Sequence, residues 1–255
     1  MQSRQEIKSS FKLLMLATAL TMILWFIPLA SFITYPFSIF GTFIHETGHA
    51  LAAFLTFGTV HDIAINGNGS GLTRTNGGWG LLISSAGYLS TTVFGAGLLL
   101  LLRSARYARP AAIGTACLLL LVTVLWGSNT GIWIAGLGFG LACLAIGLKA
   151  NIRFVHFFMS FLGIQSLLNA FYDLRILMHL SALDPAVPSD AQNMAIATGG
   201  WVPAIVWAVG WTLISLAILA GTLLIYYRSL KQHSITTPLE SVPLLTEVPP
   251  SAVNK

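Results

Sequence analysis

Residues 37–57 read FSIFGTFIHETGHALAAFLTF, an apolar stretch interrupted near its centre by His45, Glu46 and His49. About 20 apolar residues are enough for one helix to cross a bilayer. A charged side chain at the bilayer centre costs at least about 2.5–3.5 kcal/mol. Three such polar groups therefore need partners inside the protein, and the stretch predicts a membrane helix that carries a functional site.

The whole chain has the composition of a membrane protein. Of its 255 residues, 55% are hydrophobic and 8% are charged, and its mean hydropathy is +0.79. Soluble domains usually carry about a quarter charged residues, so an ordinary cytosolic globular protein is excluded. With about 20 apolar residues for each crossing, the sequence predicts an all-α polytopic membrane protein with six or seven transmembrane helices.

The apolar segments give the expected organisation of the chain. We expect crossings at residues 13–32, 37–57, 81–102, 111–126, 131–148, 154–180 and 201–227. Two β-prone segments around Asn66-Gly67 predict a short hairpin at residues 60–76, directly after the second crossing. Residues 1–230 are then one transmembrane domain, and the polar tail at 231–255 is expected to be disordered.

The basic residues indicate topology and not a nucleic-acid partner. The 13 Lys and Arg residues lie in short clusters between apolar segments and not on one basic face, although the formal charge is +5. Cytoplasmic loops of membrane proteins are enriched in Lys and Arg. We therefore expect a multi-pass protein of the bacterial inner membrane with a cytoplasmic C-terminus. The clusters that agree on this are Arg103/Arg106/Arg109, Lys149/Arg153 and Arg228/Lys231.

The polar motif in the second crossing has the spacing of a zinc site. On a helix, His45 and His49 lie on one face, and Glu46 is placed to reach a water on the bound metal. The alternative is two hydrogen-bonded histidines and a neutralised glutamate inside a helix bundle. That alternative requires three costly polar groups without a shared purpose. The motif therefore predicts a Zn²⁺ cofactor.

Zinc hydrolases usually have three protein ligands, and Asp173 is the favoured third one. Together with Glu46, it is one of two acidic residues within the apolar helices. Gln165, Asn169 and Asp173 are spaced at i, i+4 and i+8, which places them on one helix face. Lipid would not tolerate such a polar stripe, so this face is expected to turn toward protein.

Two alternatives to this assignment remain. Asp173 would instead form an ion pair with Arg175 or His179, but the i+2 and i+6 spacings do not bring these side chains together on a helix. Asp190 competes for the metal, provided that a re-entrant loop brings it there. The favoured role of Asp190 from the sequence is a surface helix N-cap.

On these residues, the chain resembles the site-2 protease family of intramembrane zinc metallopeptidases, and more specifically its compact bacterial and plastid M50B-like branch. The resemblance covers residues 37–190. It rests on the His45–His49 motif in an early apolar helix, the polar hairpin after it, Ala86-Gly87-Tyr88 at the next helix, and an aspartate in a later helix.

The chain departs from the second motif of this family, which resembles Asn-x-x-Pro-x-x-x-Leu-Asp-Gly. Gln165 stands at the Asn position, Leu168 at the Pro position, and Tyr172-Asp173-Leu174 replaces Leu-Asp-Gly. The resemblance implies cleavage of a transmembrane protein or peptide that must first be unwound. It also leaves Asn169 or Gln165 as the polar partner of the scissile carbonyl.

The sequence thus predicts a zinc-dependent endopeptidase that works within or beside the bilayer. Zinc held by His45, His49 and Asp173 would lower the pKa of its water toward 7, and Glu46 would accept the proton. Two roles are open for the strand at residues 60–65, namely to hold the substrate by β-addition or to serve as part of a plain connecting loop. Asn169, Gln165 and His61 are the expected substrate-positioning residues.

Two other function classes are compatible with polar groups in the membrane. A proton-coupled transporter would use intramembrane carboxylates and histidines as a relay, but such proteins have two similar halves, and no internal repeat is evident here. A non-catalytic metal-binding scaffold would need His45, His49 and Asp173 but not Glu46. The presence of Glu46 favours the enzyme.

Overall fold

The computed structural model of the chain describes residues 12, 13, 15, 16, 18–20, 23, 31–183 and 188–235. Most of the predicted first crossing, and the tail at residues 236–255, lie outside the described residues. The elements follow in the order α2 (Ser31–Leu55), β1 (Thr59–Ile65), β2 (Gly71–Asn76), α3 (Gly80–Leu101), the 3-10 turn η2 (Ala105–Tyr107), α4 (Ala108–Trp126), α5 (Thr130–Lys149), α6 (Ile152–Leu183), α7 (Asp190–Ala197) and α8 (Ala204–Ile235).

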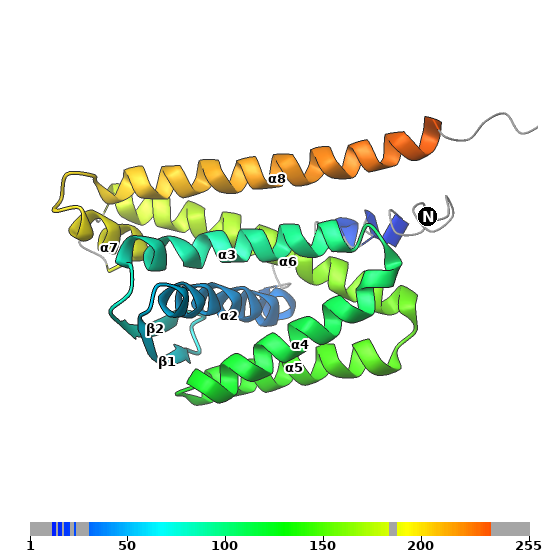
Figure 1. Cartoon of the computed structure of the whole chain (residues 1–255), viewed down its shortest axis with the longest axis horizontal. Helices are drawn as coiled ribbons and strands as arrows, with labels where there is room; N and C mark the ends of the chain where they lie inside the picture. The colour runs from blue at the N-terminus through cyan, green and yellow to red at the C-terminus, as the bar shows by residue number, and fades with distance from the viewer. Residues whose placement is uncertain are drawn as a thin grey trace, which may run out of the picture.

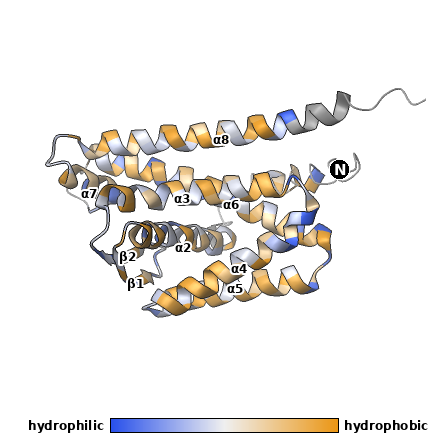
Figure 2. Ribbon diagram, viewed as in Figure 1, coloured by the Kyte–Doolittle hydropathy of each residue, from blue (hydrophilic) through white to orange (hydrophobic). Residues whose placement is uncertain are grey.

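The predicted class, a helical membrane protein with one short hairpin, is confirmed. In the described part of the chain, five helical segments are long and apolar enough to cross a membrane, namely residues 80–101, 105–126, 130–149, 152–183 and 204–228. This number is slightly below the six or seven predicted. These helices consist mostly of hydrophobic residues (Figure 2), and many of their large hydrophobic side chains are exposed, as expected where helices face lipid.

Helix α2 occupies the centre of the bundle, packed against α3, α5, α6 and the hairpin (Figure 1). Phe40 and Phe43 on this helix are fully buried in the main core. Gly48 allows α2 to approach α3 closely, because a Cβ there would lie 2.6 Å from the carbonyl oxygen of Ala86. The polar motif lowers the hydropathy of α2, and its central position shields that motif from lipid.

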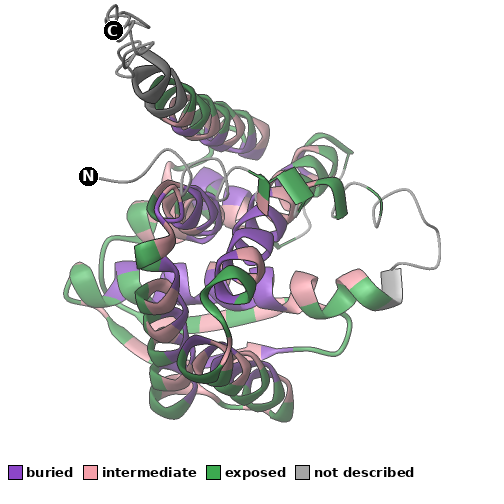
Figure 3. Ribbon diagram, turned by 90° about the vertical axis from the view of Figure 1, so that its right-hand side faces the viewer, coloured by how far each residue is buried: buried purple, intermediate pink, exposed green. Residues whose placement is uncertain are grey.

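The two longest helices, α6 and α8, differ in their surroundings. In its most apolar window, 67% of α6 is buried, against 22% for α8. Figure 3 shows the same contrast between the buried interior of the bundle and the exposed helix that leads to the C-terminus. Helix α8 continues to Ile235, so the described helix extends five residues into the segment 231–255 that was predicted as a tail.

The hairpin consists of β1 and β2 in antiparallel pairing, with Ile63 opposite Thr73 and a bulge between Val60 and Asp62. Ile63 and Ile65 point into the core and are buried. The two β-prone segments recognised in the sequence therefore form the expected hairpin, and one face of β1 is anchored in the core.

The loop between α4 and α5 covers the outer edge of β1. The Ser128 amide donates to the Ile63 carbonyl at 3.0 Å. The Asn129 side chain donates to the Ile65 carbonyl at 2.9 Å and accepts from the Ile65 amide at 3.2 Å. Asn129 also caps α5 by accepting from the Ile132 amide. The other side of this two-stranded sheet, the outer edge of β2, pairs with no strand among the described residues.

Candidate metal centre

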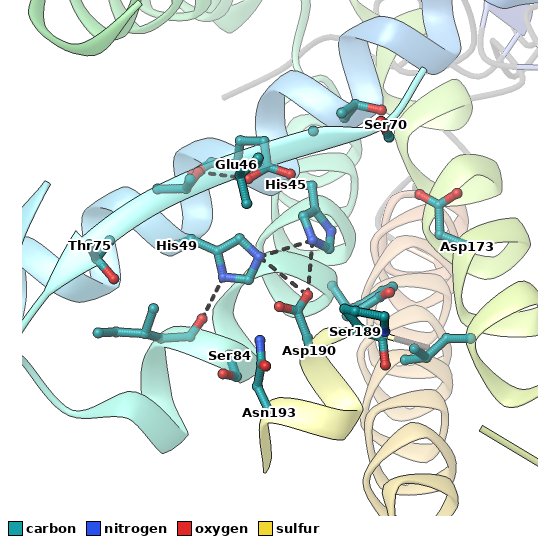
Figure 4. A pocket seen from close by; sticks show the side chains of 18 of the residues that line it. His45, Glu46, His49, Ser70, Thr75, Ser84, Asp173, Ser189, Asp190 and Asn193 are labelled. Atoms are coloured by element: carbon teal, nitrogen blue, oxygen red, sulfur yellow. Dashed lines mark hydrogen bonds and ion pairs between the residues drawn. The ribbon is translucent and has the colours of Figure 1, made fainter. Parts of the chain in front are cut away.

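Two elements bring three ligand atoms together at one point. His45 and His49 lie one turn apart on α2, and their Nε2 atoms are 3.0 Å from each other. The Asp190 carboxylate lies 3.2 Å from the His45 Nε2 and 3.3 Å from the His49 Nε2. Figure 4 shows the carboxylate between the two rings. This group is able to hold a metal ion, because all three ligand atoms lie within 4.8 Å of one another.

The surrounding residues fix the orientation of both imidazole rings. The His49 Nδ1 lies 2.6 Å from the Ile83 carbonyl on α3, to which it donates. Such a bond leaves the Nε2 lone pair free for a metal, as is usual for histidine ligands. The His45 ring packs edge-on against Tyr88, with ring centroids 4.6 Å apart, and Tyr88 stacks on Trp211 of α8.

Gly87 on α3 provides the space in front of the two imidazoles. A Cβ at this position would lie 2.5 Å from the His49 Nε2 and would also collide with the His45 Nε2. The two nitrogens therefore face a volume that any side chain would fill. Two imidazoles and one carboxylate facing such a space are a donor set that fits zinc in a hydrolase, where one coordination position stays open.

Glu46 is held by the hairpin, beside the ligands but not among them. Its side chain is buried, and its Oε2 accepts a hydrogen bond from the Thr73 hydroxyl of β2 at 2.6 Å. Gly71, also on β2, leaves room for the carboxylate, because a Cβ there would collide with it. The sequence pattern does not reveal Thr73, since a threonine in a strand is common whatever its role.

The carboxylate that the structure places at the two histidines is Asp190, whereas the sequence favoured Asp173 as the third ligand. Asp190 is the first residue of α7, and the N-cap predicted for it is formed instead by Ser189, which accepts from the Gln192 amide. Burial alone would raise the pKa of the Asp190 carboxyl, but the two histidines outweigh this effect and hold the pKa well below its usual range. Asp190 thus carries the charge that a metal ligand needs.

Asp173 lies on the wall of the same cavity and outside the group of three ligand atoms. The reason is the path of the chain, because α6 passes beside the cavity while α7 turns back and directs its N-terminus at the histidines (Figure 4). The cavity has a volume of about 640 Å³. It is lined by α2, β2, the loop before β2, the first half of α3, the last turns of α6, and α7.

The three residues predicted to position the substrate do not line this cavity. Asn169 donates to the Phe37 carbonyl at 2.7 Å and thereby joins α6 to α2. Gln165 is buried in the bundle with 2% of its surface exposed, which agrees with the predicted protein-facing stripe. His61 is exposed on β1. Their geometry assigns Asn169 and Gln165 to helix packing and leaves His61 on the surface.

Comparison with known families identifies the chain. The sequence profile of the peptidase M50B-like family matches residues 14–222, which is most of the chain. The chain belongs to the peptidase M50B-like family. The matched region includes the candidate metal centre, from α2 to α7. This family is one of membrane metallopeptidases. Neither the curated proteins nor the solved structures contain a match to it.

Proposed function

We propose that the protein is a zinc-dependent endopeptidase that cleaves transmembrane proteins or peptides within or beside the bilayer. The observation that carries this proposal is the convergence of His45, His49 and Asp190, with Glu46 next to them on the same helix. The cavity of about 640 Å³ in front of these residues has room for a peptide segment. We place the protein in the bacterial inner membrane, with no nucleic-acid partner.

In this proposal, His45, His49 and Asp190 hold the metal, and Glu46 handles the proton. When bound by these residues, a zinc ion would supply Lewis-acid chemistry, which would lower the pKa of water to about 7 and polarise a peptide carbonyl. Glu46 accepts the proton of the attacking water and transfers it to the leaving amine. The Thr73 hydroxyl holds the Glu46 carboxylate in place, so the base keeps its position through both transfers.

The open edge of β2 is the best-placed backbone for holding a substrate. The edge of β1, which the sequence suggested for this purpose, is covered at Ile63 and Ile65 by the α4–α5 loop. Strand β2 carries Thr73, which binds Glu46, and it lines the cavity with four residues, Gly71, Leu72, Thr73 and Thr75. A substrate strand added to β2 would extend beside the metal ligands, with its peptide bonds freed from helical hydrogen bonding.

The test separates metal binding from catalysis. In purified protein, we expect about one zinc per chain, and the variant His45→Ala should lose most of it, whereas the exposed His61→Ala should not. Glu46→Gln should keep the zinc and lose cleavage of a transmembrane substrate, because the amide cannot accept a proton. A Glu46→Gln enzyme that cleaves at the wild-type rate would refute the proposed mechanism.

The metal-binding scaffold is the main competing outcome of this experiment. A wild-type protein that binds zinc but cleaves no transmembrane substrate in a broad panel would favour the scaffold. The buried position of Glu46 argues against it, because burying an extra carboxylate beside three ligands has a cost that a scaffold would not need to bear.

A further inference from the structure

We propose that Asp173 selects substrates that carry a lysine or arginine close to the scissile bond. This inference rests on the proposed peptidase function and names the class of substrate that the site accepts. Asp173 lines the cavity from α6, across from the hairpin, and its carboxylate points toward the space beside His45 (Figure 4). The mechanism described above gives this carboxylate no task.

Asp173 has no hydrogen-bond or ion-pair partner within the described part of the chain, and its one charged-group neighbour given by the electrostatics is His45, which is neutral when it binds a metal. No Lys or Arg is among the described residues that line the cavity. Arg175, two residues further on, lies on an exposed part of α6. A carboxylate inside a membrane protein is energetically costly without a partner. We therefore expect a basic side chain of the bound substrate to be the partner of Asp173.

The charges of the site lead to the same conclusion. With a divalent cation bound, the charges of Asp190 and Glu46 balance the metal. Asp173 then adds one negative charge, and its neighbour His45 does not compensate this charge because a metal-bound imidazole is neutral. An isolated excess charge in a low-dielectric cavity strongly favours a ligand of opposite charge.

The neighbours of Asp173 define the rest of the preferred segment. Ile176, Leu177 and Leu180 follow at i+3, i+4 and i+7, so the same face of α6 presents three aliphatic side chains to the cavity. A segment with one basic residue among apolar ones would match this wall. Such sequences occur where a transmembrane helix ends and its flanking Lys or Arg begins.

The experiment uses the full-length zinc-loaded protein and single-pass substrates that differ at one position. Lys, Arg, Gln or Glu is placed in turn at each of the three residues on either side of the scissile bond. At one position, we expect kcat/KM to be about tenfold or more higher for Lys or Arg than for Gln, the size expected for a hydrogen bond between charged groups. Asp173→Asn should remove this preference while zinc is retained, and Asp173→Lys should favour Glu.

The controls distinguish this inference from the proposed function. Asp62→Asn, at a carboxylate outside the cavity, should leave the preference intact. Equal rates for all wild-type substrates, or a Lys preference that survives in Asp173→Asn, would refute the inference and leave the peptidase function standing. Zinc loss in Asp173→Asn would show that Asp173 acts as a ligand and would also refute it.

A binding assay keeps the inference testable without cleavage. In the Glu46→Gln background, a Lys-containing peptide should bind about tenfold more tightly than its Gln counterpart, and adding Asp173→Asn should remove the difference. Equal binding of the two peptides would contradict a cation-selecting role for Asp173, even if the wild-type protein cleaved nothing.

Discussion

At the scale of single residues, the site depends as much on a missing side chain as on those present. Gly87→Ala would place a methyl group against the Nε2 atoms of His45 and His49. We expect the variant to lose most of its zinc and its activity while keeping its fold, because Ala is a better helix former than Gly by about 0.5–1 kcal/mol. Metal analysis and circular dichroism would measure the two effects.

Gly97→Ala is the matched control for this prediction. It lies on the same helix, and a Cβ there meets nothing within 4 Å. Zinc content should therefore stay at the wild-type level. A Gly87→Ala protein with full zinc would show that the metal lies elsewhere than between the two imidazoles.

Substitutions at the two candidate carboxylates are expected to differ in their effect on zinc affinity. Asp190→Asn should weaken zinc binding by more than about tenfold, because a neutral amide is a poor zinc ligand and the carboxylate is the third member of the group. Asp173→Asn should leave zinc affinity almost unchanged. Titration with a competing chelator measures both, and the reverse result would return Asp173 to the ligand position.

The sequence alone predicts that His45, Glu46 and His49 lie together, but it does not predict that Asp190 joins them. The spacing of the first three residues is enough, because an α-helix places residues four positions apart on the same face. The meeting of His49 with Asp190 depends on how α7 packs, and spacing along the chain does not encode that. The signal for Asp190 was local, a Ser189-Asp190 pair at a helix start, which has the same appearance whether the end lies at a surface or at a metal.

At the scale of elements, the proposed mechanism makes the hairpin part of the catalytic apparatus. Thr73→Val removes the hydroxyl that binds the Glu46 carboxylate while keeping a β-branched side chain in the strand. We expect cleavage to fall about tenfold or more, since hydrogen bonds to charged groups contribute about 1.5–3 kcal/mol. Zinc content should not change.

Rescue by a smaller hydroxyl residue provides the control for this strand. Thr73→Ser keeps the donor and should recover most of the activity lost in Thr73→Val. If the Ser and Val variants are equally impaired, the contribution of Thr73 is packing and the hydroxyl does not position the base.

The existence of the hairpin followed from the Asn66-Gly67 turn and its β-prone flanks, whereas the choice of its open edge did not. Ser128 and Asn129 close the edge of β1, and both lie more than 60 residues away in the chain. Contacts between such distant segments are settled by the packing of α4 and α5 against the core. Local propensity therefore located the strands, but it did not indicate which of their two outer edges stays open.

At the scale of the whole molecule, the basic clusters and the cavity lie at opposite ends. Helix α3 ends, α4 begins and α5 joins α6 at one end, where Arg109 donates to the Gly147 and Ala150 carbonyls. The hairpin and α7 lie at the other end (Figure 1). If the basic end is cytoplasmic, the cavity faces the opposite side of the membrane.

This orientation is testable with a membrane-impermeant thiol reagent on intact cells. In a Cys117→Ser, Cys143→Ser background, Ser70→Cys beside the cavity should be labelled from outside, whereas Arg106→Cys should react only after lysis. The reversed pattern would place the cavity on the cytoplasmic side. The sequence supplied the five crossings found in the described part of the chain and their order, because apolar length encodes them, but the central position of α2 required the structure.

The open edge of β2 also has a mechanical consequence for the substrate. Six residues of a substrate paired along Gly71–Asn76 would span about 20 Å when extended, against about 9 Å when helical. When it binds in the extended form, the six-residue substrate segment becomes about 11 Å longer than in the helix. At least one end of the substrate must therefore be free to move. A transmembrane segment with one free end should be cleaved faster than the same segment tethered by folded domains on both sides of the membrane, and equal rates would argue against pairing along the full strand. The enzyme would then respond to tension, so that a prior cut or the loss of a bound partner on one side releases the substrate for cleavage.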